Sequence, residues 1–407
     1  MASKLQQLLG TSGKAKVLAQ NDDDVVIVSA LRTAITKAKK GGFKDTMPEE
    51  LLSNVLHAVY TRAKLDPKLI DDIIVGNVLP PGGGATAARM AALAAGIPNS
   101  VPIATVNRQC SSGLTSVSQI AAAITSGSID IGIGAGVESM THGYGAGAMA
   151  ARFSDKIMEN EEAADCLVPM GITSENVAEM YSLKRDDLDA FAARSFEKAA
   201  KAQKEGWFRD EIVPVKVTTE DGKEIIVDRD DGVRDGVTKE SLSKLKPAFK
   251  AGGTTHAGNA SQVSDGAAAV LLARRSVAKK LGLPIIGKFV AASVVGVPPK
   301  IMGVGPGYAI PKVLAKTGLA KTDVDFYEIN EAFATQAWWS IREIGLDESK
   351  VNPHGGAIAL GHPLGATGAR QIATGLNRAK RTGEKIFVTS MCIGSGMGMA
   401  AVFVNEQ

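Results

Sequence analysis

Residues 101–114, VPIATVNRQCSSGL, decide the fold, because an extended run ends within them and a helical run begins. The apolar run over 101–106 predicts a short buried strand. After Cys110, apolar residues recur at helical spacing up to Ile124, and Gly127 supplies a helix end. The segment therefore predicts a strand-to-helix junction with a thiol at the start of the helix.

Strand-like and helical patterns alternate on both sides of this junction, which predicts an α/β fold. Further strands are predicted at 73–75 and 129–136. From 143 to 253 the alternation weakens and charged residues become more frequent. We interpret that block as an inserted domain, with an amphipathic helix over 185–206 and a hairpin turn at Asp221-Gly222.

Two features echo between the first and the last part of the chain. Small-residue strands are predicted at 266–272 and 398–404, and both Cys110 and His362 precede a helical run. The echo predicts two similar halves whose helix starts face each other. Chance similarity between small-residue strands is the alternative interpretation.

The composition excludes several classes of protein. The 407 residues carry a formal net charge of +3, which gives no argument for a nucleic-acid or membrane-surface partner. Three cysteines are too few for a disulfide framework, so a reducing compartment is expected. No apolar run approaches the ~20 residues that span a bilayer. Residues 1–23 lack the apolar core of a secretory signal, and we expect a flexible extension or a targeting segment there.

Cys110 is the first candidate for chemistry. Unpaired N–H groups and positive partial charge gather at a helix N-terminus, so we expect a lowered thiol pKa and a high thiolate fraction. The neighbouring backbone N–H groups can hold an oxyanion. The alternative is a small buried residue used only for packing.

Two further motifs complete a candidate thiol-based site. His362 lies in the turn 361–365, GHPLG, where glycines permit close ligand approach and histidine is a natural base for a thiol. Cys392 precedes the glycine-rich run 393–398, which suits a second reactive thiol better than a dinucleotide loop. A turn histidine bonded only to backbone is the alternative for His362.

Asn330 and Glu331 follow a predicted strand over 324–329. A carboxamide and a carboxylate at a strand end can hold a water molecule or orient a histidine. The alternative is that Asn330 caps the helix that follows.

The remaining cysteine and histidines are weaker candidates. Cys166 is expected to serve packing, and His57, in a helical pattern, is expected to be structural. The other histidines, all in glycine-rich segments, are His142, His256 and His354. No metal is implied, because the cysteines and histidines lack close ligand spacing.

Together these residues resemble the thiolase family over almost the whole chain, from Asp24 to Val404, and within it the peroxisomal 3-ketoacyl-CoA thiolases. Several motifs carry the resemblance in the right order. They are 107–114 (NRQCSSGL), 136–140 (GVESM), 166–176 (CLVPMGITSEN), 255–266, 330–333 (NEAF), 355–368 and 390–398.

The resemblance implies a five-layered αβαβα sandwich of two similar halves with an inserted loop domain. It divides the chain into an N-terminal extension (1–23), a first half (24–142, completed by 254–285), a loop domain (143–253) and a second half (286–407).

It also implies a role for each catalytic side chain. Cys110 is acylated by the substrate, and His362 deprotonates it. Cys392 deprotonates incoming CoA, or the acetyl-CoA methyl group in the synthetic direction. No cofactor is implied beyond the substrate coenzyme A.

The remaining implied roles concern oxyanions and CoA. One oxyanion hole uses His362 and a water molecule held by Asn330, and the other uses the backbone N–H groups of Cys110 and Gly394. Arg234 and Ser261 match positions that contact CoA.

The implied activity is that of an acetyl-CoA C-acyltransferase in fatty acid β-oxidation, which cleaves 3-ketoacyl-CoA with CoA to acetyl-CoA and a shortened acyl-CoA. A biosynthetic acetoacetyl-CoA thiolase is the alternative, and a non-catalytic acyl-CoA-binding protein is the remote one. The expected assembly is a homodimer, or a tetramer of paired dimers, with neither nucleic acid nor membrane as a partner.

The expected compartment is the peroxisomal matrix, and the cytosol is the alternative. Lys4-Leu5 fit the N-terminal import signal of the family, whereas Thr11-Ser12 occupy its final pair and do not fit. The chain also ends in Asn405-Glu406-Gln407 rather than in a Ser-Lys-Leu-type tripeptide.

Overall fold

The structure, a computed structural model, describes residues 13–145 and 152–407. The half-matching import signal at 4–12 therefore lies outside the described residues. Among the residues that are described, no helix is both long and apolar enough to cross a membrane.

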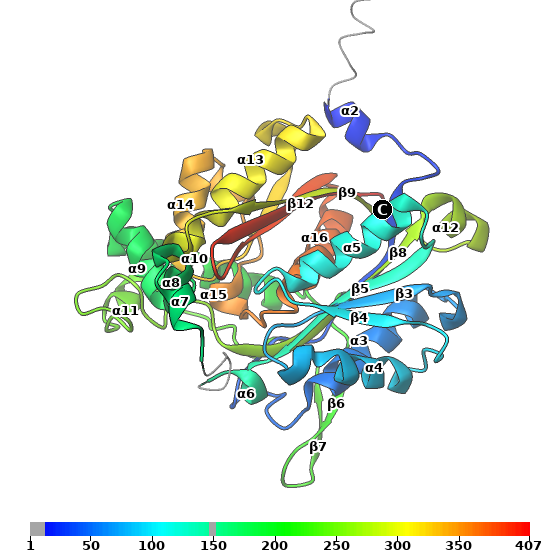
Figure 1. The fold of residues 1–407 in the computed structure, drawn as a ribbon, viewed down its shortest axis with the longest axis horizontal. Coiled ribbons are helices and arrows are strands. Elements are labelled where there is room, and N and C mark those ends of the chain that lie inside the picture. The colour runs from blue at the N-terminus through cyan, green and yellow to red at the C-terminus, as the bar shows by residue number, and fades with distance from the viewer. Residues whose placement is uncertain (1–12, 146–151) are drawn as a thin grey trace, which may run out of the picture.

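A mixed sheet runs through the molecule (Figure 1). Its strands are β1 (Val25–Arg32), β2 (Thr36–Lys37), β3 (Asp72–Gly76), β4 (Ile103–Val106), β5 (Ile131–Ser139), β8 (Ser264–Arg274), β9 (Gly287–Gly296), β10 (Phe326–Ile329), β11 (Ile386–Ile393) and β12 (Met397–Asn405). Their order is β10-β11-β12-β9-β1-β8-β5-β3-β4, and β2 pairs with β8.

The sheet consists of two halves that repeat the same arrangement of four strands, to which the first half adds β4 and β2. In the first, β3 is parallel to β5, and β5, β8 and β1 pair antiparallel in turn. In the second, β10 is parallel to β11, and β11, β12 and β9 pair antiparallel in turn. The halves join where β1 pairs with β9. The predicted duplication is thus confirmed as a repeated order of strands.

Two helices, α5 (Ser112–Ser126) and α16 (Thr367–Thr382), lie between the two halves of the sheet (Figure 1). Side chains of β8 alternate between two apolar clusters, because successive strand residues point to opposite faces. Val270 and Leu272 join the cluster that contains α5 and α16, whereas Leu271 joins the cluster of the outer helices. Strands buried on both faces explain the near-continuous apolar runs in the sequence.

The outer faces are covered by one further helical layer each. The first half carries α3 (Pro48–Arg62) with α4 (Ala85–Ala94), and the second carries α13 (Gly305–Thr317) with α14 (Ala334–Ile344) (Figure 1). The layers alternate as helix, sheet, helix, sheet, helix, which confirms the expected five-layered αβαβα sandwich.

The other helices are shorter or lie outside these layers. They are α2 (Gly13–Leu18), α6 (Met140–Gly143), α7 (Asp155–Met158), α8 (Glu161–Asp165), α9 (Met170–Met180), α10 (Arg185–Lys204), α11 (Lys239–Ser243), α12 (Arg275–Leu281) and α15 (Ala357–Leu360). Short 3-10 helices occupy Pro67–Leu69, Pro81–Gly84, Pro299–Val304, Lys321–Asp323 and Glu348–Lys350.

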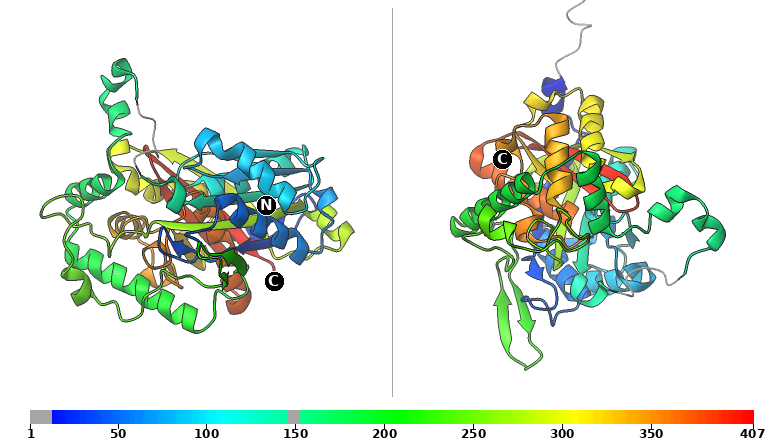
Figure 2. Two further views of the ribbon diagram at one scale, coloured as in Figure 1. Left: turned by 90° about the horizontal axis from the view of Figure 1, so that it is seen from below. Right: turned by 90° about the vertical axis from the view of Figure 1, so that its left-hand side faces the viewer.

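Between β5 and β8 the chain leaves the layered core (Figures 1 and 2). The amphipathic helix predicted over 185–206 is α10, which packs against α14 and α15. The predicted hairpin is β6 (Val215–Thr218) with β7 (Glu224–Val227), turning at Gly222 with φ of +78°.

Buried ion pairs attach this segment to the core. Arg32 on β1 is 1% exposed and binds Glu211 at 2.6 Å and Asp230 at 2.7 Å. All three side chains are buried, so removal of one leaves a buried charge without its partner. Such a removal is expected to destabilise the folded protein strongly.

Candidate active site

Cys110 lies in a tight turn between β4 and α5, as the sequence predicts. The residue before it, Gln109, has a left-handed backbone with φ of +48°. The Ser112 hydroxyl donates to the Gln109 carbonyl at 2.7 Å and accepts from the Arg108 N–H at 2.9 Å, which closes the turn. A non-glycine residue in this conformation is uncommon and is often found at functional sites.

Glycines bring the start of α5 against the start of α16. A Cβ added at Gly113 would lie 2.6 Å from the Gly365 carbonyl oxygen, and one added at Gly368 would lie 2.3 Å from the Leu114 nitrogen. No side chain fits in that space, so glycine is required for this approach. The two helix starts therefore meet face to face, as the duplication predicts.

Cys392 lies at the end of β11 and is fully buried. The turn to β12 has left-handed backbone at Ser395 (φ +60°) and Gly396 (φ +91°). This turn brings the Gly394 N–H to the Cys110 thiol, which the Cys110 N–H also contacts. Cys392 lies close enough to Cys110 that a negative charge on the Cys110 sulfur raises the pKa of Cys392. The two cysteines and the two backbone donors thus converge.

His362 lies in the turn before α16, which begins at Thr367 rather than at the histidine itself. Gly361 has φ of +107°, and a Cβ there would lie 2.2 Å from the Ser264 hydroxyl, so only glycine fits. The His362 N–H donates to the Gln262 carbonyl at 3.1 Å. Its ring Nδ1 lies 2.6 Å from the Thr367 hydroxyl, and its Nε2 lies 3.3 Å from the Asn330 Nδ2.

Asn330 follows β10 and is 1% exposed. Its side chain faces the histidine, and its Oδ1 has no hydrogen-bond partner within the described part of the chain. The alternative that it caps a helix is wrong, because α14 begins at Ala334 with Phe333 as its N-cap. The neighbouring carboxylate does not orient the histidine. Glu331 instead binds Ser195 at 2.6 Å and Asn352 at 2.7 Å.

The expectation of a lowered thiol pKa is wrong for the free protein. Burial raises the pKa of the Cys110 thiol to about 11, although the N–H groups of Gly394 and Cys110 oppose the rise. Burial likewise raises the pKa of Cys392 well above its usual range, and the charge of Cys110 adds to this. Desolvation outweighs the helix N-terminus, so both sulfur atoms are held as thiols.

Burial, assisted by the Arg370 cation, lowers the pKa of His362 to about 3. The imidazole is therefore neutral near pH 7. A neutral imidazole has a lone pair that can accept a proton, and it becomes a hydrogen-bond donor once it has done so.

The two residues expected to contact CoA lie on segments that approach the histidine turn. The guanidinium of Arg234 lies 5.0 Å from the Phe196 ring centroid, and the Ser261 N–H donates to the Ala332 carbonyl at 2.9 Å. Gln262 joins these segments, since its Nε2 donates to the Gly232 carbonyl at 3.1 Å while its own carbonyl accepts from His362.

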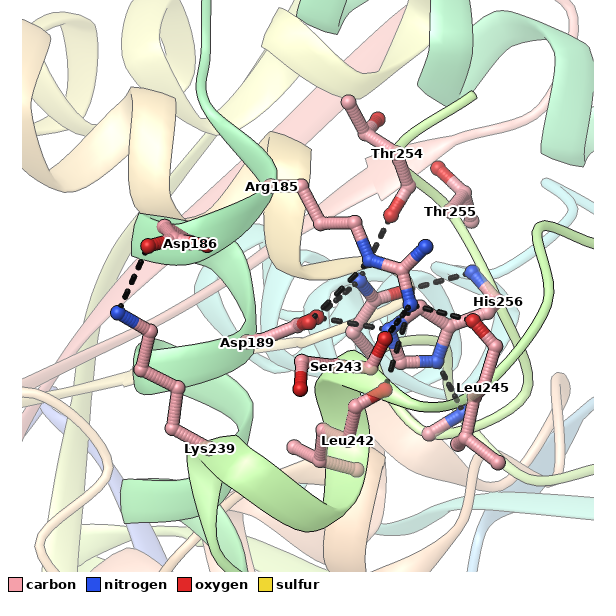
Figure 3. Close-up of polar contacts among 12 residues, drawn as sticks. Arg185, Asp186, Asp189, Lys239, Leu242, Ser243, Leu245, Thr254, Thr255 and His256 are labelled. Atoms are coloured by element: carbon pink, nitrogen blue, oxygen red, sulfur yellow. Dashed lines mark hydrogen bonds and ion pairs between the residues drawn. The ribbon is translucent and has the colours of Figure 1, made fainter. Parts of the chain in front are cut away.

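Both ring nitrogens of His256 have partners other than the residues of the thiol site (Figure 3). Its Nδ1 accepts from the Gly258 N–H at 3.0 Å, so its Nε2 donates to Asp189 on α10 at 2.7 Å. Arg185 on the same helix donates to the Leu242 carbonyl at 3.3 Å (Figure 3). Nε2 therefore holds the inserted segment through α10, while Nδ1 closes the local turn at Gly258.

The other weaker candidates have similar structural contacts. His57 Nδ1 lies 2.9 Å from the Tyr60 hydroxyl, as expected for a structural residue, and the His354 ring packs against Trp207 at a tilt of 40°, with centroids 4.2 Å apart. The backbone N–H of His142 donates to the Ser139 hydroxyl at 3.4 Å.

Cys166, expected to serve packing, is only half-buried at the end of α8. Its sulfur lies 3.9 Å from the Ser395 carbonyl oxygen. In the described residues, no group of three or more His, Cys, Asp or Glu side chains is placed to hold a metal ion.

Three residues that contact the His362 turn had no role assigned from the sequence: Thr367, Gln262 and Glu138. Thr367 and Gln262 act through contacts across a turn that residue types alone do not reveal. Glu138 had a signal, since it is a lone acid near the end of a nine-residue strand whose every residue is buried.

Comparisons with known proteins agree with this geometry. The family described as "Thiolase, N-terminal domain" matches residues 25–276, and "Thiolase, C-terminal domain" matches 283–405. The "3-ketoacyl-CoA thiolase, peroxisomal" of Yarrowia lipolytica is 58% identical over 410 residues, covering 100% of this chain and 99% of its own.

Solved structures give the same result. The dimeric peroxisomal thiolase of Saccharomyces cerevisiae matches with a TM-score of 0.91 and 54% identity, covering 96% of this chain and 100% of that one. A second structure, of the peroxisomal 3-ketoacyl-CoA thiolase of the same yeast, is described as five-layered and constructed from two core domains of identical topology. It matches with a TM-score of 0.80 and 50% identity over 96% of this chain and 100% of that one. The chain belongs to the thiolase family.

Proposed function

We propose that this protein cleaves 3-ketoacyl-CoA with CoA to acetyl-CoA and a shortened acyl-CoA, by way of an acyl group on Cys110. One observation carries the proposal: two thiols and two backbone N–H donors converge, and the turn that holds a neutral imidazole packs against the start of α5, the helix that follows Cys110. The reaction needs a nucleophile, two acid/base groups and oxyanion donors, and this set supplies each of them.

In the first half-reaction, Nε2 of His362 takes the proton of the Cys110 thiol. The thiolate attacks the keto carbon, the bond between C2 and C3 breaks, and its electrons form the enolate of acetyl-CoA. Cys392 gives its proton to C2 of the enolate. Acetyl-CoA leaves, and Cys110 holds the acyl group as a thioester.

In the second half-reaction, the Cys392 thiolate takes the proton of incoming CoA. The CoA thiolate attacks the acyl carbon, and the Cys110 sulfur leaves. The sulfur then recovers its proton from His362. Since the acyl group passes between sulfur atoms, its activated thioester bond is kept throughout.

Each carbonyl attack places negative charge on oxygen, and two sites suit those oxygens. The N–H groups of Cys110 and Gly394, both directed at the nucleophilic sulfur, form one. His362, protonated after the first step, forms the other with a water molecule held by Asn330. The buried Oδ1 of Asn330, which lacks a partner in the described residues, supports that assignment.

We assign CoA binding to Arg234 and Ser261, and no cofactor is needed beyond the substrate CoA. The peroxisomal matrix is the proposed compartment, following the printed names of the relatives. A homodimer is the proposed assembly, following the dimeric yeast structure. Tetramers, formed by pairing dimers through the loop domain, are a further proposal. Light scattering at micromolar concentration is expected to give at least the dimer mass.

We also propose the division of the chain into a first half (24–142 and 254–285), a loop domain (143–253) and a second half (286–407). The repeated strand order supports it, because β1 to β5 and β8 belong to one unit and β9 to β12 to the other. The elements between β5 and β8 add no strand to either unit.

Trapping the acyl-enzyme tests the proposed function. Mixing the protein with a 3-ketoacyl-CoA in the absence of free CoA is expected to add one acyl mass to the peptide that contains Cys110. An acyl mass found only on Cys166 would contradict the proposal. Steady-state thiolysis with short and long substrates then separates a degradative enzyme from a biosynthetic acetoacetyl-CoA thiolase.

A further inference from the structure

Glu138 is a buried carboxylate between the two segments that carry the nucleophile and the base. It lies on β5 and is 0% exposed. Its Oε1 accepts from the Leu79 N–H at 3.1 Å, and its Oε2 accepts from the Gly365 N–H at 2.9 Å. The Val78 N–H also contacts the carboxylate. One side chain thus satisfies backbone donors of both halves.

The contact with Gly365 reaches the base. Gly365 ends the turn that holds His362, and that turn is pressed against the first half of the sheet. A Cβ at Gly365 would lie 2.6 Å from the Val137 carbonyl oxygen, and one at Gly136 would lie 2.1 Å from the Gly365 carbonyl oxygen. The backbones of β5 and of the His362 turn are in direct contact there, and the Glu138 carboxylate forms a hydrogen bond from one to the other.

The contacts with Val78 and Leu79 reach the nucleophile. The Val78 carbonyl accepts from the Asn107 side chain at 3.2 Å, and the Asn107 Oδ1 accepts from the Gln109 N–H at 2.9 Å. Gln109 is the left-handed residue immediately before Cys110. A continuous path of hydrogen bonds therefore runs from Glu138 to the turn that presents the thiol.

We propose that Glu138 is a positioning residue that fixes the Cys110 turn relative to the His362 turn by binding backbone N–H groups of both. The inference rests on the proposed function, because it concerns the proton transfer between these two residues. It goes beyond that function by assigning the geometry of the pair to a side chain that touches neither substrate nor the reacting atoms.

The carboxylate also has an unfavourable effect on the nucleophile, and this effect makes the positioning role testable. Its negative charge raises the pKa of the Cys110 thiol, so it opposes thiolate formation. An acidic residue at this position therefore does not serve to activate the thiol through its charge. Replacing it with glutamine removes the charge and turns one N–H acceptor into an N–H donor. Proton transfer should become slower although the free thiol becomes more reactive.

The test compares Glu138→Gln with wild type and with Glu175→Gln. Glu175 is the matched control, being 4% exposed and accepting from the Thr254 N–H at 2.9 Å and the Thr255 N–H at 2.8 Å. Burial raises the pKa of Glu138 to about 7. Measurements are therefore made at about pH 8.5, where the wild-type carboxylate is ionised.

We expect Glu138→Gln to transfer the acyl group at least about tenfold more slowly in rapid-quench experiments, with KM within about threefold of wild type. Iodoacetamide should modify its Cys110 at least as fast as in wild type. Glu175→Gln should lose stability in urea but keep its turnover number. Wild-type turnover on the same substrate separates a failure of this inference from a failure of the proposed function.

Turnover by Glu138→Gln within about twofold of wild type would overturn the inference. The inference would also be overturned if alkylation of Cys110 slowed by the same factor as turnover, because that result would indicate general disruption of the site. If Glu138→Gln does not fold, Asn107→Leu replaces it. Asn107 is exposed, and its loss breaks the same path at a site that the core does not need. It is expected to slow acyl transfer with little change in KM, and unchanged acyl transfer would also overturn the inference.

Discussion

The Nδ1 atom of His362 lies 2.6 Å from the Oγ1 atom of Thr367, five residues further along the chain. The Thr367 hydroxyl donates to the Pro363 carbonyl at 3.0 Å, so its oxygen is left to accept from Nδ1–H. This network assigns the neutral tautomer that carries its proton on Nδ1. Nε2 then carries the lone pair, which accepts from the Asn330 Nδ2 group at 3.3 Å, and is the basic nitrogen.

Replacing Thr367 with valine is expected to slow acyl transfer by about tenfold to hundredfold. The change keeps the shape but leaves the buried Nδ1–H unpaired, which costs about 1–3 kcal/mol and frees the ring to adopt the wrong tautomer. Rapid-quench measurement of acyl transfer to Cys110 gives the rate.

Thr374→Val is the matched control on the same helix, because the Thr374 hydroxyl donates to Glu211 at 2.8 Å and not to the histidine. It is expected to lose stability and to keep its acyl-transfer rate. Equal rates for wild type and Thr367→Val would show that the hydroxyl does not set the tautomer.

The alkylation rate of Cys110 is expected to rise with pH up to about 11. Burial raises the pKa of this thiol to about 11, so the thiolate fraction in the free protein stays small at neutral pH. Iodoacetamide labelling across a pH series, followed by mass spectrometry of the Cys110 peptide, measures the profile. A plateau already at about pH 7 would reveal a preformed thiolate–imidazolium pair and contradict the neutral state argued above.

Local sequence patterns identified the candidate site residues, but they did not indicate the electrostatic surroundings of those residues. The strand-to-helix junction at Cys110 and the glycines at 361, 365 and 394 are local features, and local patterns describe them well. These segments come together only because the second half of the sheet repeats the first. The sequence indicated that repeat only through two weakly similar strands.

The thiol pKa was mispredicted because a helix start was considered without the burial around it. Desolvation depends on the groups packed around an atom, and here those groups include Cys392 and Gly394, which are distant in sequence. The role of Glu331 was mispredicted for a similar reason. Its partners Ser195 and Asn352 come from separate segments, which no spacing near the NEAF run reveals.

Acid destabilisation is expected to involve His354 as well as His362. Burial and the Arg378 and Arg381 cations lower the pKa of His354 to about 3, below its value of about 6.5 in the unfolded chain. Such a group adds stability above pH 6.5 that is lost as the pH falls toward 3, because the unfolded chain binds the extra proton.

His354→Gln is therefore expected to flatten the fall of the unfolding free energy between about pH 6 and pH 4 by one proton, or ~1.4 kcal/mol per pH unit. Urea unfolding at a series of pH values measures the slope. His362→Asn should flatten it by a similar amount, and the double variant by the sum. A slope unchanged in both single variants would mean that neither ring is held neutral.

The last prediction separates the two thiols of the site. Cys110 precedes a helix and is contacted by two backbone N–H groups, whereas Cys392 ends a strand and is fully buried. Cys110→Ala is expected to abolish both acyl-enzyme formation and turnover. Cys392→Ala should still accept an acyl group on Cys110 but release acetyl-CoA and react with CoA about 10²–10⁴ times more slowly, since one positioned acid/base is lost.

His362→Ala should impair both half-reactions, because it removes a base and an oxyanion donor together, each worth roughly 10²-fold or more. Cys166→Ala is the control, since it removes the third thiol of the chain and should keep its turnover. Rapid-quench acyl transfer measured beside steady-state thiolysis distinguishes the four variants. Thiolysis by Cys392→Ala at nearly the wild-type rate would refute the two-cysteine mechanism even if Cys110 kept its role. In that case the imidazole would have to carry both proton transfers, and the proximity of the second thiol would need another explanation.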